Sequence, residues 1–299
     1  MGASDMPVAE VDIDEGLVRA LLEDQHPDLA DRPITPLAFG WDNVLFRLGD
    51  DLTVRLPRRT LGAQLLDHEL RWLPELAPTL PLPSPVALRR GEPGPGYPWS
   101  WAICPWLPGD VAALVPPAHP HAAAAALGSF VAALHRPAPP GAPVSDIRGC
   151  PLADRSETTL DRLAQVADDL ADLDAVELRA RFLDLVTTEP WAAPPVWVHG
   201  DLHPANLLVL DGAVSAVLDW GDLNAGDPAT DLAVAWMLLP RGARATFRAA
   251  AGVDDATWRR GSGWALVLGV LCVASSADNA LIDAMGRRTL AAVLADPVP

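Results

Sequence analysis

Short strand-like runs dominate the first third of the chain, and one helix interrupts them. Four short, largely apolar stretches are bounded by glycine, proline and aspartate residues, and this is typical of strands. The four predicted strands are residues 43–48, 52–56, 86–89 and 99–104. Gly49-Asp50-Asp51 joins the first two as a hairpin turn, and the leucines of residues 61–76 line one side of a predicted helix.

Helical periodicity dominates the rest of the chain. Three amphipathic helices are expected on this basis, at residues 121–135, 157–170 and 176–186. The longest apolar run, residues 264–274, is too short to cross a bilayer and predicts a buried helix instead. The prolines and glycine of residues 105–109 interrupt the pattern, so we expect two lobes, residues 1–104 and residues 105–299.

The helical pattern breaks between residues 194 and 219, where short strands return. Two apolar runs flank Asp211-Gly212, and Asp-Gly between two such runs is among the strongest hairpin signals. The hairpin brings Asp219, at its end, close to Asn206, which stands just before its first strand. Asp201 precedes Asn206 by five positions in the same loop. We therefore expect three oxygen-bearing side chains at one edge of a small sheet.

These three side chains suit a magnesium site. Mg²⁺ prefers one or two carboxylates together with waters and substrate phosphates, and a carboxylate free of the metal accepts a hydroxyl proton. Asp201, Asn206 and Asp219 stand in the order of the kinase Asp, the Asn five residues on and the later metal-binding Asp, which predicts phosphoryl transfer. A zinc site made of His199, Asp201 and His203 is the alternative, but it leaves Asn206 and Asp219 without a role.

The motif around these residues resembles that of the aminoglycoside phosphotransferase family. It consists of His199-Gly-Asp-Leu-His-Pro-Ala-Asn206, a hairpin, Asp219-Trp-Gly221, Gly226-Asp-Pro228 and Asp231-Leu-Ala233. The resemblance is dense over residues 197–233 and looser over the first lobe. It implies an α+β, protein-kinase-like bilobal fold, with a small β-rich N-terminal lobe that binds nucleotide. The larger, helical C-terminal lobe is implied to carry the catalytic and substrate-binding residues.

The resemblance also assigns roles to individual residues. Asp201 is implied to be the catalytic base, and His199 to shape the catalytic loop around it. Asn206 and Asp219 are implied to bind Mg²⁺, whereas Asp231 is implied to support the fold rather than to touch substrate.

A basic strand residue holds the α- and β-phosphates in this fold, and a helix carboxylate pairs with it. The chain contains no lysine, so Arg55 takes this place and Glu69 is its expected partner, because arginine grips phosphate and carboxylate through paired hydrogen bonds. Surface positions for Arg55 and Glu69 are the simpler alternative. Gly40 and Asn43 are expected to donate to phosphate, and the purine of ATP or GTP is expected beside Ile103.

The residues after this strand bear on the substrate. Arg55-Leu-Pro57, followed by two arginines, resembles the macrolide phosphotransferase branch of the family, in which arginine also stands at this position. The first function expected is O-phosphorylation of an aminoglycoside or related antibiotic, in resistance or self-protection. A macrolide phosphotransferase and a metabolic sugar or amino-alcohol kinase are alternatives. A pseudokinase, which binds nucleotide without transfer, is a third.

The net charge of −17 argues against a nucleic-acid partner, because phosphate backbones require a basic patch. It suits a cationic substrate, and it suits solubility equally well. Among the acidic residues Asp227, Asp254 and Asp255 are candidates to meet substrate amines, the last two being equally consistent with a helix start. Trp236 is a candidate to contact a bulky apolar substrate, although most of the 11 tryptophans are expected in the core.

The cysteines point to a reducing compartment. Cys104, Cys150 and Cys272 are odd in number and far apart, so we expect buried thiols rather than disulfides or a metal site. The acidic start of the chain lacks the pattern of a signal peptide. We therefore expect a cytoplasmic protein that acts as a monomer on a small molecule, without a membrane partner.

Overall fold

The computed structural model describes residues 7–170, 173–275 and 279–296. Two compact units divide them. The sheet unit comprises residues 7–78 and 83–108, and the helical unit comprises residues 79–82 and the described residues from 109 on. The expected lobe boundary, between residues 104 and 105, falls inside a strand. The chain stays with the sheet slightly longer, because Pro105 pairs with Leu52 and the backbone N–H of Trp106 donates to Asp51.

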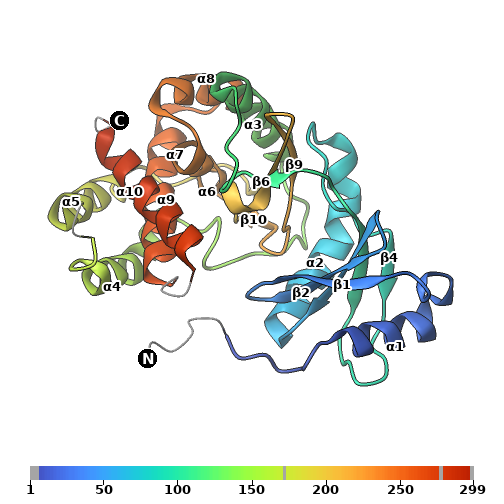
Figure 1. The fold of residues 1–299 in the computed structure, drawn as a ribbon. Helices are drawn as coiled ribbons and strands as arrows, with labels where there is room; N and C mark the ends of the chain where they lie inside the picture. The colour runs from blue at the N-terminus through green and yellow to red at the C-terminus, as the bar shows by residue number, and fades with distance from the viewer. Residues whose placement is uncertain (1–6, 171–172, 276–278, 297–299) are drawn as a thin grey trace. The chain divides into compact units, whose positions relative to one another are not determined.

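The sheet unit contains one five-stranded antiparallel sheet in the order β1-β2-β3-β5-β4 and two α-helices (Figure 1). Its elements are α1 Glu15–Gln25, η1 Pro27–Leu29, β1 Ile34–Phe39, β2 Asn43–Leu48, β3 Leu52–Pro57, α2 Thr60–Leu76, η2 Ala77–Thr79, β4 Arg89–Gly91 and β5 Trp101–Pro105. The predicted hairpin of β2 and β3 and the predicted helix α2 are confirmed. The strand expected at residues 86–89 begins only at Arg89, since three closely spaced prolines precede it and proline cannot donate to a sheet.

The two faces of this sheet are covered differently. Val18, Leu21 and Leu22 of α1 join the apolar side chains of the strands in the main core of the unit. Leu66 of α2 packs on the other side, against Ala102 and Cys104 of β5. Because both faces are covered, all six residues of β3 are buried. A charged residue on β3 therefore needs a partner inside the protein.

The helical unit consists mainly of helices, with two small sheets among them. Its elements are β6 Asp110–Val111, α3 Pro120–Leu134, η3 Leu152–Arg155, α4 Ser156–Val166, α5 Ala175–Leu185, β7 Val196–Val198, η4 Pro204–Asn206, β8 Leu207–Leu210, β9 Ala213–Val217, β10 Asn224–Gly226, α6 Ala229–Leu232, α7 Val234–Leu238, α8 Arg241–Ala251, α9 Asp255–Ala274 and α10 Ala280–Ala295. The helices expected over α3, α4 and α5 are confirmed, although α4 ends at Val166, four residues before its predicted end.

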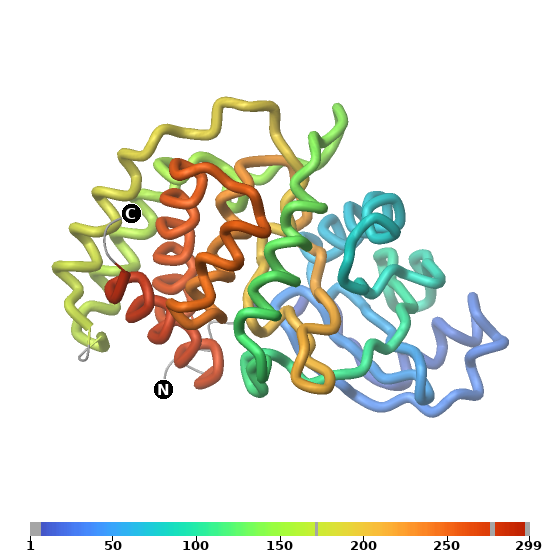
Figure 2. The backbone as a smooth tube through the Cα atoms, turned by 90° about the horizontal axis from the view of Figure 1, so that it is seen from above, coloured from blue at the N-terminus to red at the C-terminus, as the bar shows by residue number. Residues whose placement is uncertain are grey.

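Helix α9 runs through the middle of the helical unit. It contacts α4, α6 and α10, and Figures 1 and 2 both show α9 and α10 side by side in red. Nearly all of its residues from Thr257 to Val273 are buried, as expected for a helix surrounded by others. The apolar run of residues 264–274 is therefore a core helix, and no helix among the described residues is long and apolar enough to span a membrane.

The hairpin of β8 and β9 positions the candidate site. Asp211 and Gly212, at its turn, both have positive φ, of 52° and 77°, which a type I′ turn requires. Leu210 pairs with Ala213 across the turn, so the register is the one that the Asp-Gly dipeptide predicts. The short strand β6 extends this sheet by pairing with β8.

Candidate active site

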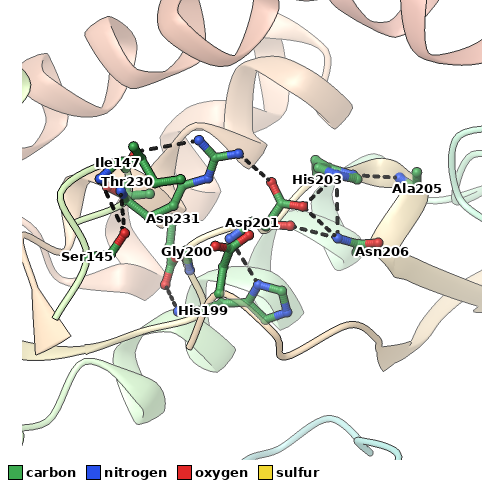
Figure 3. Close-up of polar contacts among 12 residues, drawn as sticks. Ser145, Ile147, His199, Gly200, Asp201, His203, Ala205, Asn206, Thr230 and Asp231 are labelled. Carbon is green, nitrogen blue, oxygen red and sulfur yellow. Dashed lines mark hydrogen bonds and ion pairs between the residues drawn. The ribbon is translucent and has the colours of Figure 1, made fainter. Parts of the chain in front are cut away.

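Asp231 fixes the backbone where the candidate catalytic loop begins. It is fully buried in α6, and its carboxylate accepts the backbone N–H groups of His199 at 2.8 Å and Gly200 at 2.9 Å (Figure 3). His135 Nε2 lies 3.1 Å from Asp231 Oδ2. Gly200 has φ of +84°, and a Cβ there would lie 2.4 Å from the carbonyl oxygen of Asp222, so the turn requires glycine. The prediction that Asp231 supports the fold is confirmed.

His199 shapes the loop from inside. Its ring is buried beside Trp220, at 4.8 Å between ring centroids. Burial lowers the pKa of His199 despite the opposing effect of the nearby carboxylates, so the ring is neutral. Nε2 lies 3.0 Å from the carbonyl oxygen of Leu218 and donates to it, while Nδ1 accepts the backbone N–H of Asp201 at 3.3 Å. With both nitrogens engaged, His199 links the loop to the end of the hairpin.

Asp201 lies at the centre of a network in which every neighbour donates to it (Figure 3). Its Oδ2 is 3.2 Å from His203 Nε2 and accepts from Asn206 Nδ2 at 3.3 Å, while its Oδ1 accepts from Arg148 Nη2 at 3.3 Å. His203 Nδ1 accepts the backbone N–H of Ala205, which leaves Nε2 as the nitrogen that donates to Asp201. Since Oδ2 has two donors and Oδ1 one, Oδ1 keeps room for a hydroxyl.

The electrostatics of this network keep Asp201 ionised. Burial by itself raises the pKa of Asp201, but His203 and Arg148 outweigh burial and hold the pKa well below its usual range. Burial likewise opposes the charged forms of His203 and Arg148, and the Asp201 carboxylate outweighs it and raises the pKa of each. An ionised carboxylate with a free lone pair accepts and orients a hydroxyl group.

The backbone ties the residue before Asp219 to Asn206. The backbone N–H of Leu218 donates to the carbonyl oxygen of Asn206 at 2.8 Å, so the residue before Asp219 is tied to Asn206. Asn206 Nδ2 donates to the backbone oxygen of Asp201 at 3.0 Å, which turns the amide nitrogen inward and leaves Oδ1 for a cation. Asp219 has φ of 55°, a conformation that costs energy for a residue other than glycine and is often found at functional sites.

This donor set fits Mg²⁺ better than zinc. The protein offers only one amide oxygen and one carboxylate. So small a set of protein ligands is usual for Mg²⁺, because waters and nucleotide phosphates complete its coordination. The zinc alternative is not supported, because both ring nitrogens of His199 already make hydrogen bonds. Among the described residues no group of three or more His, Cys, Asp or Glu side chains is arranged to hold a metal.

Arg148 is the contact of Asp201 that the sequence does not reveal. It stands in the connector between α3 and η3, 53 positions before Asp201, and its side chain is buried. Proline-rich composition marks this segment only as a connector. The nearest sequence signal is a polar stretch, Ser145-Asp-Ile-Arg-Gly149, within otherwise small and apolar residues.

Arg55 and Glu69 form a buried ion pair in the sheet unit. Arg55 lies on β3 opposite Ala102 of β5, and its Nη2 donates to Oε2 of Glu69 on α2. The two residues are 7% and 2% exposed, so neither is the surface residue of the simpler alternative. The expected pairing of Arg55 with Glu69 is confirmed.

The other expected nucleotide contacts are Gly40, Asn43 and Ile103, and the structure does not support all of them. The backbone N–H of Gly40 donates to the carbonyl oxygen of Asn43 at 2.9 Å, so the expectation that it donates to phosphate is wrong in this conformation. Ile103 is fully buried in the core shared with α1, and its carbonyl oxygen accepts from Leu88, so the expected purine contact is also wrong. Asn43 Oδ1 is buried and has no hydrogen bond with any described residue.

The two expected substrate residues belong to the core of the helical unit. Asp227 is 4% exposed, and both of its carboxylate oxygens accept from Arg260, at 2.7 and 3.1 Å. Trp236 is 3% exposed, stacks on Trp258 and donates to Asp296 at 2.8 Å. Substrate contact by Asp227 and Trp236 is therefore a wrong prediction, because a satisfied buried ion pair and a packed indole have nothing to offer a ligand. Asp254 is the N-cap of α9, so of its two expected roles the structure shows the helix start.

The fold and the loop together define a class of protein, the kinase-like phosphotransferases. A small antiparallel sheet unit, a helical unit and the loop of Asp201 and Asn206 before a hairpin are the features of that class. A family model described as the phosphotransferase enzyme family matches residues 33–264, more than half of the chain. The chain belongs to this family, and the expected α+β kinase-like fold and family are confirmed.

Solved structures of similar fold come from antibiotic kinases. The GDP complex of aminoglycoside 2′-phosphotransferase-IIIa is 20% identical, covers 94% of this chain and 99% of its own, and has a TM-score of 0.69. Macrolide 2′-phosphotransferase MphH from Brachybacterium faecium is 24% identical over 94% of this chain and 98% of its own, with a TM-score of 0.59. At these identities the likeness concerns the fold. A search of the curated proteins found no match.

Proposed function

We propose that this phosphotransferase moves the γ-phosphate of ATP or GTP onto a hydroxyl group of a small molecule, an aminoglycoside or related antibiotic in the first instance. The observation that carries the proposal is the arrangement of Asp201, Asn206 and Asp219 around the hairpin. Proteins of similar fold have been solved as complexes with GDP or ADP, which supports a nucleoside triphosphate as the donor.

Asp201 has the central part in the proposed reaction. Its Oδ1 accepts the hydrogen bond of the attacking hydroxyl and orients the oxygen toward the phosphorus, while His203 and Asn206 hold the carboxylate through Oδ2. Asn206 Oδ1 and the Asp219 carboxylate are the proposed ligands of Mg²⁺, which when bound offsets the negative charge of the phosphate oxygens. Positioning and electrostatics of this kind supply most of the catalysis in phosphoryl transfer.

Arg55 is the proposed cation for the α- and β-phosphates, and Glu69 holds its guanidinium in place. Arginine serves here because its planar group hydrogen-bonds a carboxylate on one side and phosphate oxygens on the other. Asn43, the first residue of β2, remains a proposed contact of the phosphates through its amide Nδ2, because phosphate oxygens need a donor.

The acceptor is the least constrained part of the proposal. Proteins of similar fold have been solved as complexes with kanamycin, gentamicin and streptomycin, and a net charge of −17 favours such cations. The arginine at position 55 and the similar fold of MphH favour a macrolide instead. A metabolic hydroxyl compound shares every motif described, so the acceptor class has to be measured.

The test is release of nucleoside diphosphate by the purified protein with Mg²⁺, with ATP and GTP in turn. The acceptor panel contains aminoglycosides, macrolides, other hydroxylated antibiotics, simple sugars and amino-alcohols. Acceptor-dependent release that Asp201→Asn abolishes supports the proposal. Asp161→Asn, on the exposed side of α4, is the matched control and should retain full activity. Tight nucleotide binding without release for any acceptor would favour the pseudokinase alternative.

A further inference from the structure

Two arginines near the catalytic loop are buried with too few anionic partners. Arg148 and Arg155 are each 8% exposed. Arg148 reaches Asp201 through Nη2 and makes a long contact of 3.5 Å from Nη1 to its neighbour Ile147, while its Nε has no partner among the described residues. The side chain of Arg155 makes no hydrogen bond or ion pair with any described residue, and its Nε is buried.

A third arginine stands beside them. Arg162 follows Arg155 by seven positions, and Arg155 has helical φ and ψ of −88° and −4°, so two turns of η3 and α4 place both on one face. Burial, followed by the positive charges of Arg155 and Arg148, lowers the pKa of Arg162, which marks the three side chains as electrostatic neighbours. Arg162 is half-buried and provides the more open side of this arginine cluster.

An unpaired buried charge is costly, so this arrangement needs an explanation. Acidic residues are plentiful, 39 against 22 arginines, yet among the described residues Asp201 is the one carboxylate that pairs with the cluster, while Asp222 acts on Arg148 through its charge and raises its pKa. Asp146 and Asp154 flank the cluster in sequence but are exposed to solvent. A positive site in a chain of charge −17 is therefore a local feature and not a consequence of composition.

The backbone beneath the cluster is anchored to the elements that hold the catalytic loop. Ser145 Oγ accepts the backbone N–H groups of Ile147 and Arg148. Gly149, with φ of +67°, donates to Thr230 Oγ1 at 2.9 Å, and its carbonyl oxygen accepts from Asp227 at 2.7 Å. Arg148 is thus held by the residues around α6, from which Asp231 also supports the catalytic loop.

We infer that Arg148, Arg155 and Arg162 form a binding site for an oxyanion, a phosphate or carboxylate group, next to Asp201. Guanidinium groups suit this ligand because their N–H donors match the spacing of its oxygens. The anion has two possible sources: a group that the acceptor carries beside its hydroxyl, or the phosphate that has just been transferred. Only the assignment of the source rests on the proposed function, because an oxyanion would bind to the cluster whether or not the protein turns over.

Thermal unfolding of the full chain in increasing inorganic phosphate tests the site directly. We expect phosphate to raise the melting temperature of the wild type by about 3 °C or more near saturation, because a ligand of the native state stabilises it. Arg155→Met removes the charge and keeps an unbranched stem about as long as the aliphatic part of arginine. Without phosphate it should unfold at the same temperature as the wild type or higher, and with phosphate it should gain much less.

Controls separate binding from the general effect of the salt. Phosphate as an excluded salt stabilises every variant alike, so the difference between variants is the measured quantity. Arg179→Met, on an exposed position of α5, should respond like the wild type. If Arg155→Met does not fold, Arg162→Met serves in its place and should weaken the response. Equal phosphate responses in the wild type and the folded variant would overturn the inference.

Three further probes distinguish the sources in the same assay: glycerol 3-phosphate, glycerate and glycerol. Stabilisation of the wild type by the phosphate ester and by glycerate, lost in Arg155→Met, assigns the site to an anionic group of the acceptor. Stabilisation by the phosphate ester and inorganic phosphate alone assigns it to the transferred phosphate. Stabilisation by glycerol to the same extent as by the charged probes would contradict an oxyanion site.

Discussion

The candidate catalytic loop and the Arg55–Glu69 pair carry charge in two different ways. In the loop, Asp201 has donors on both oxygens and remains 23% exposed, so its charge can serve a ligand. In the sheet unit, Arg55 and Glu69 lie on separate elements 14 positions apart, and both are nearly inaccessible. In the proposed reaction the loop presents its charge to the acceptor, whereas the pair both supports the sheet unit and serves the phosphates.

Removing the charge of Asp201 should have the largest effect on activity and little effect on the fold. Asp201→Asn retains the size of the side chain and one acceptor for His203 or Asn206, but it loses the charge that orients the hydroxyl. We expect turnover to fall about 100- to 10,000-fold, the range for losing a general base. Steady-state kinetics would measure turnover and calorimetry would measure nucleotide affinity. The affinity should change little. Turnover within a few-fold of the wild type would remove Asp201 from the mechanism.

Breaking the Arg55–Glu69 pair should do the reverse and affect the fold most. Glu69→Gln leaves a buried guanidinium short of its carboxylate, which costs about 3–5 kcal/mol of unfolding free energy. The double variant Glu69→Gln with Arg55→Met should recover part of that loss, because no buried charge remains. Urea titrations monitored by circular dichroism would report it, with Glu75→Gln, exposed on the same helix, as the control. A loss below 1 kcal/mol would show that the pair has no structural part.

Asp231→Asn should have an intermediate effect on both properties. The amide keeps one oxygen, but its NH₂ group then faces a backbone N–H of His199 or Gly200 and cannot accept from it. We expect a loss of about 1–3 kcal/mol in unfolding free energy, the cost of an unsatisfied buried donor, together with lower turnover. Denaturant titration and kinetics on the same sample would show whether the two losses occur together. Wild-type values for both would contradict the supporting role of Asp231.

The smallest effect concerns the cysteines, which the structure shows free and buried, as expected from the sequence. Burial raises the pKa of Cys104 and of Cys272 to about 12, and it also raises the pKa of Cys150. Thiol reagents attack the thiolate, so native protein at pH 8 should label slowly at all three positions. Mass spectrometry before and after denaturation would show three labels only in the unfolded chain. Rapid labelling of native Cys104 would mean that the region around Arg55 opens readily.

The same comparison explains what the sequence could predict. The candidate catalytic loop can be predicted from the sequence because its residues lie within eight positions. The hairpin that returns the chain from Asn206 to Asp219 has an unambiguous turn at Asp211-Gly212. Arg55 and Glu69 could be paired from their strand and helix positions. Arg148 could not be predicted, since its contact with Asp201 depends on the path of a 53-position connection.

Three of the wrong predictions share one physical cause. Asp227, Trp236 and Ile103 are candidates by residue type and position, but burial decides whether a side chain meets a ligand, and burial depends on tertiary packing. Gly40 is a separate case, because the N–H group expected to donate to phosphate already donates to Asn43. Strand β1 is not predicted because Ile34–Phe39 contains a proline and lacks clear alternation.

Identification of the reaction product tests the central claim most directly. The protein would be incubated with Mg²⁺, a nucleoside triphosphate and an acceptor that stimulates nucleotide turnover, and the product analysed by ³¹P nuclear magnetic resonance and mass spectrometry. The account predicts a phosphate monoester on one hydroxyl of the acceptor, formed by the wild type and by Asp161→Asn but not by Asp201→Asn. A nucleotidyl group or a phosphoramidate on the acceptor would contradict it, as would nucleotide hydrolysis that leaves the acceptor unchanged.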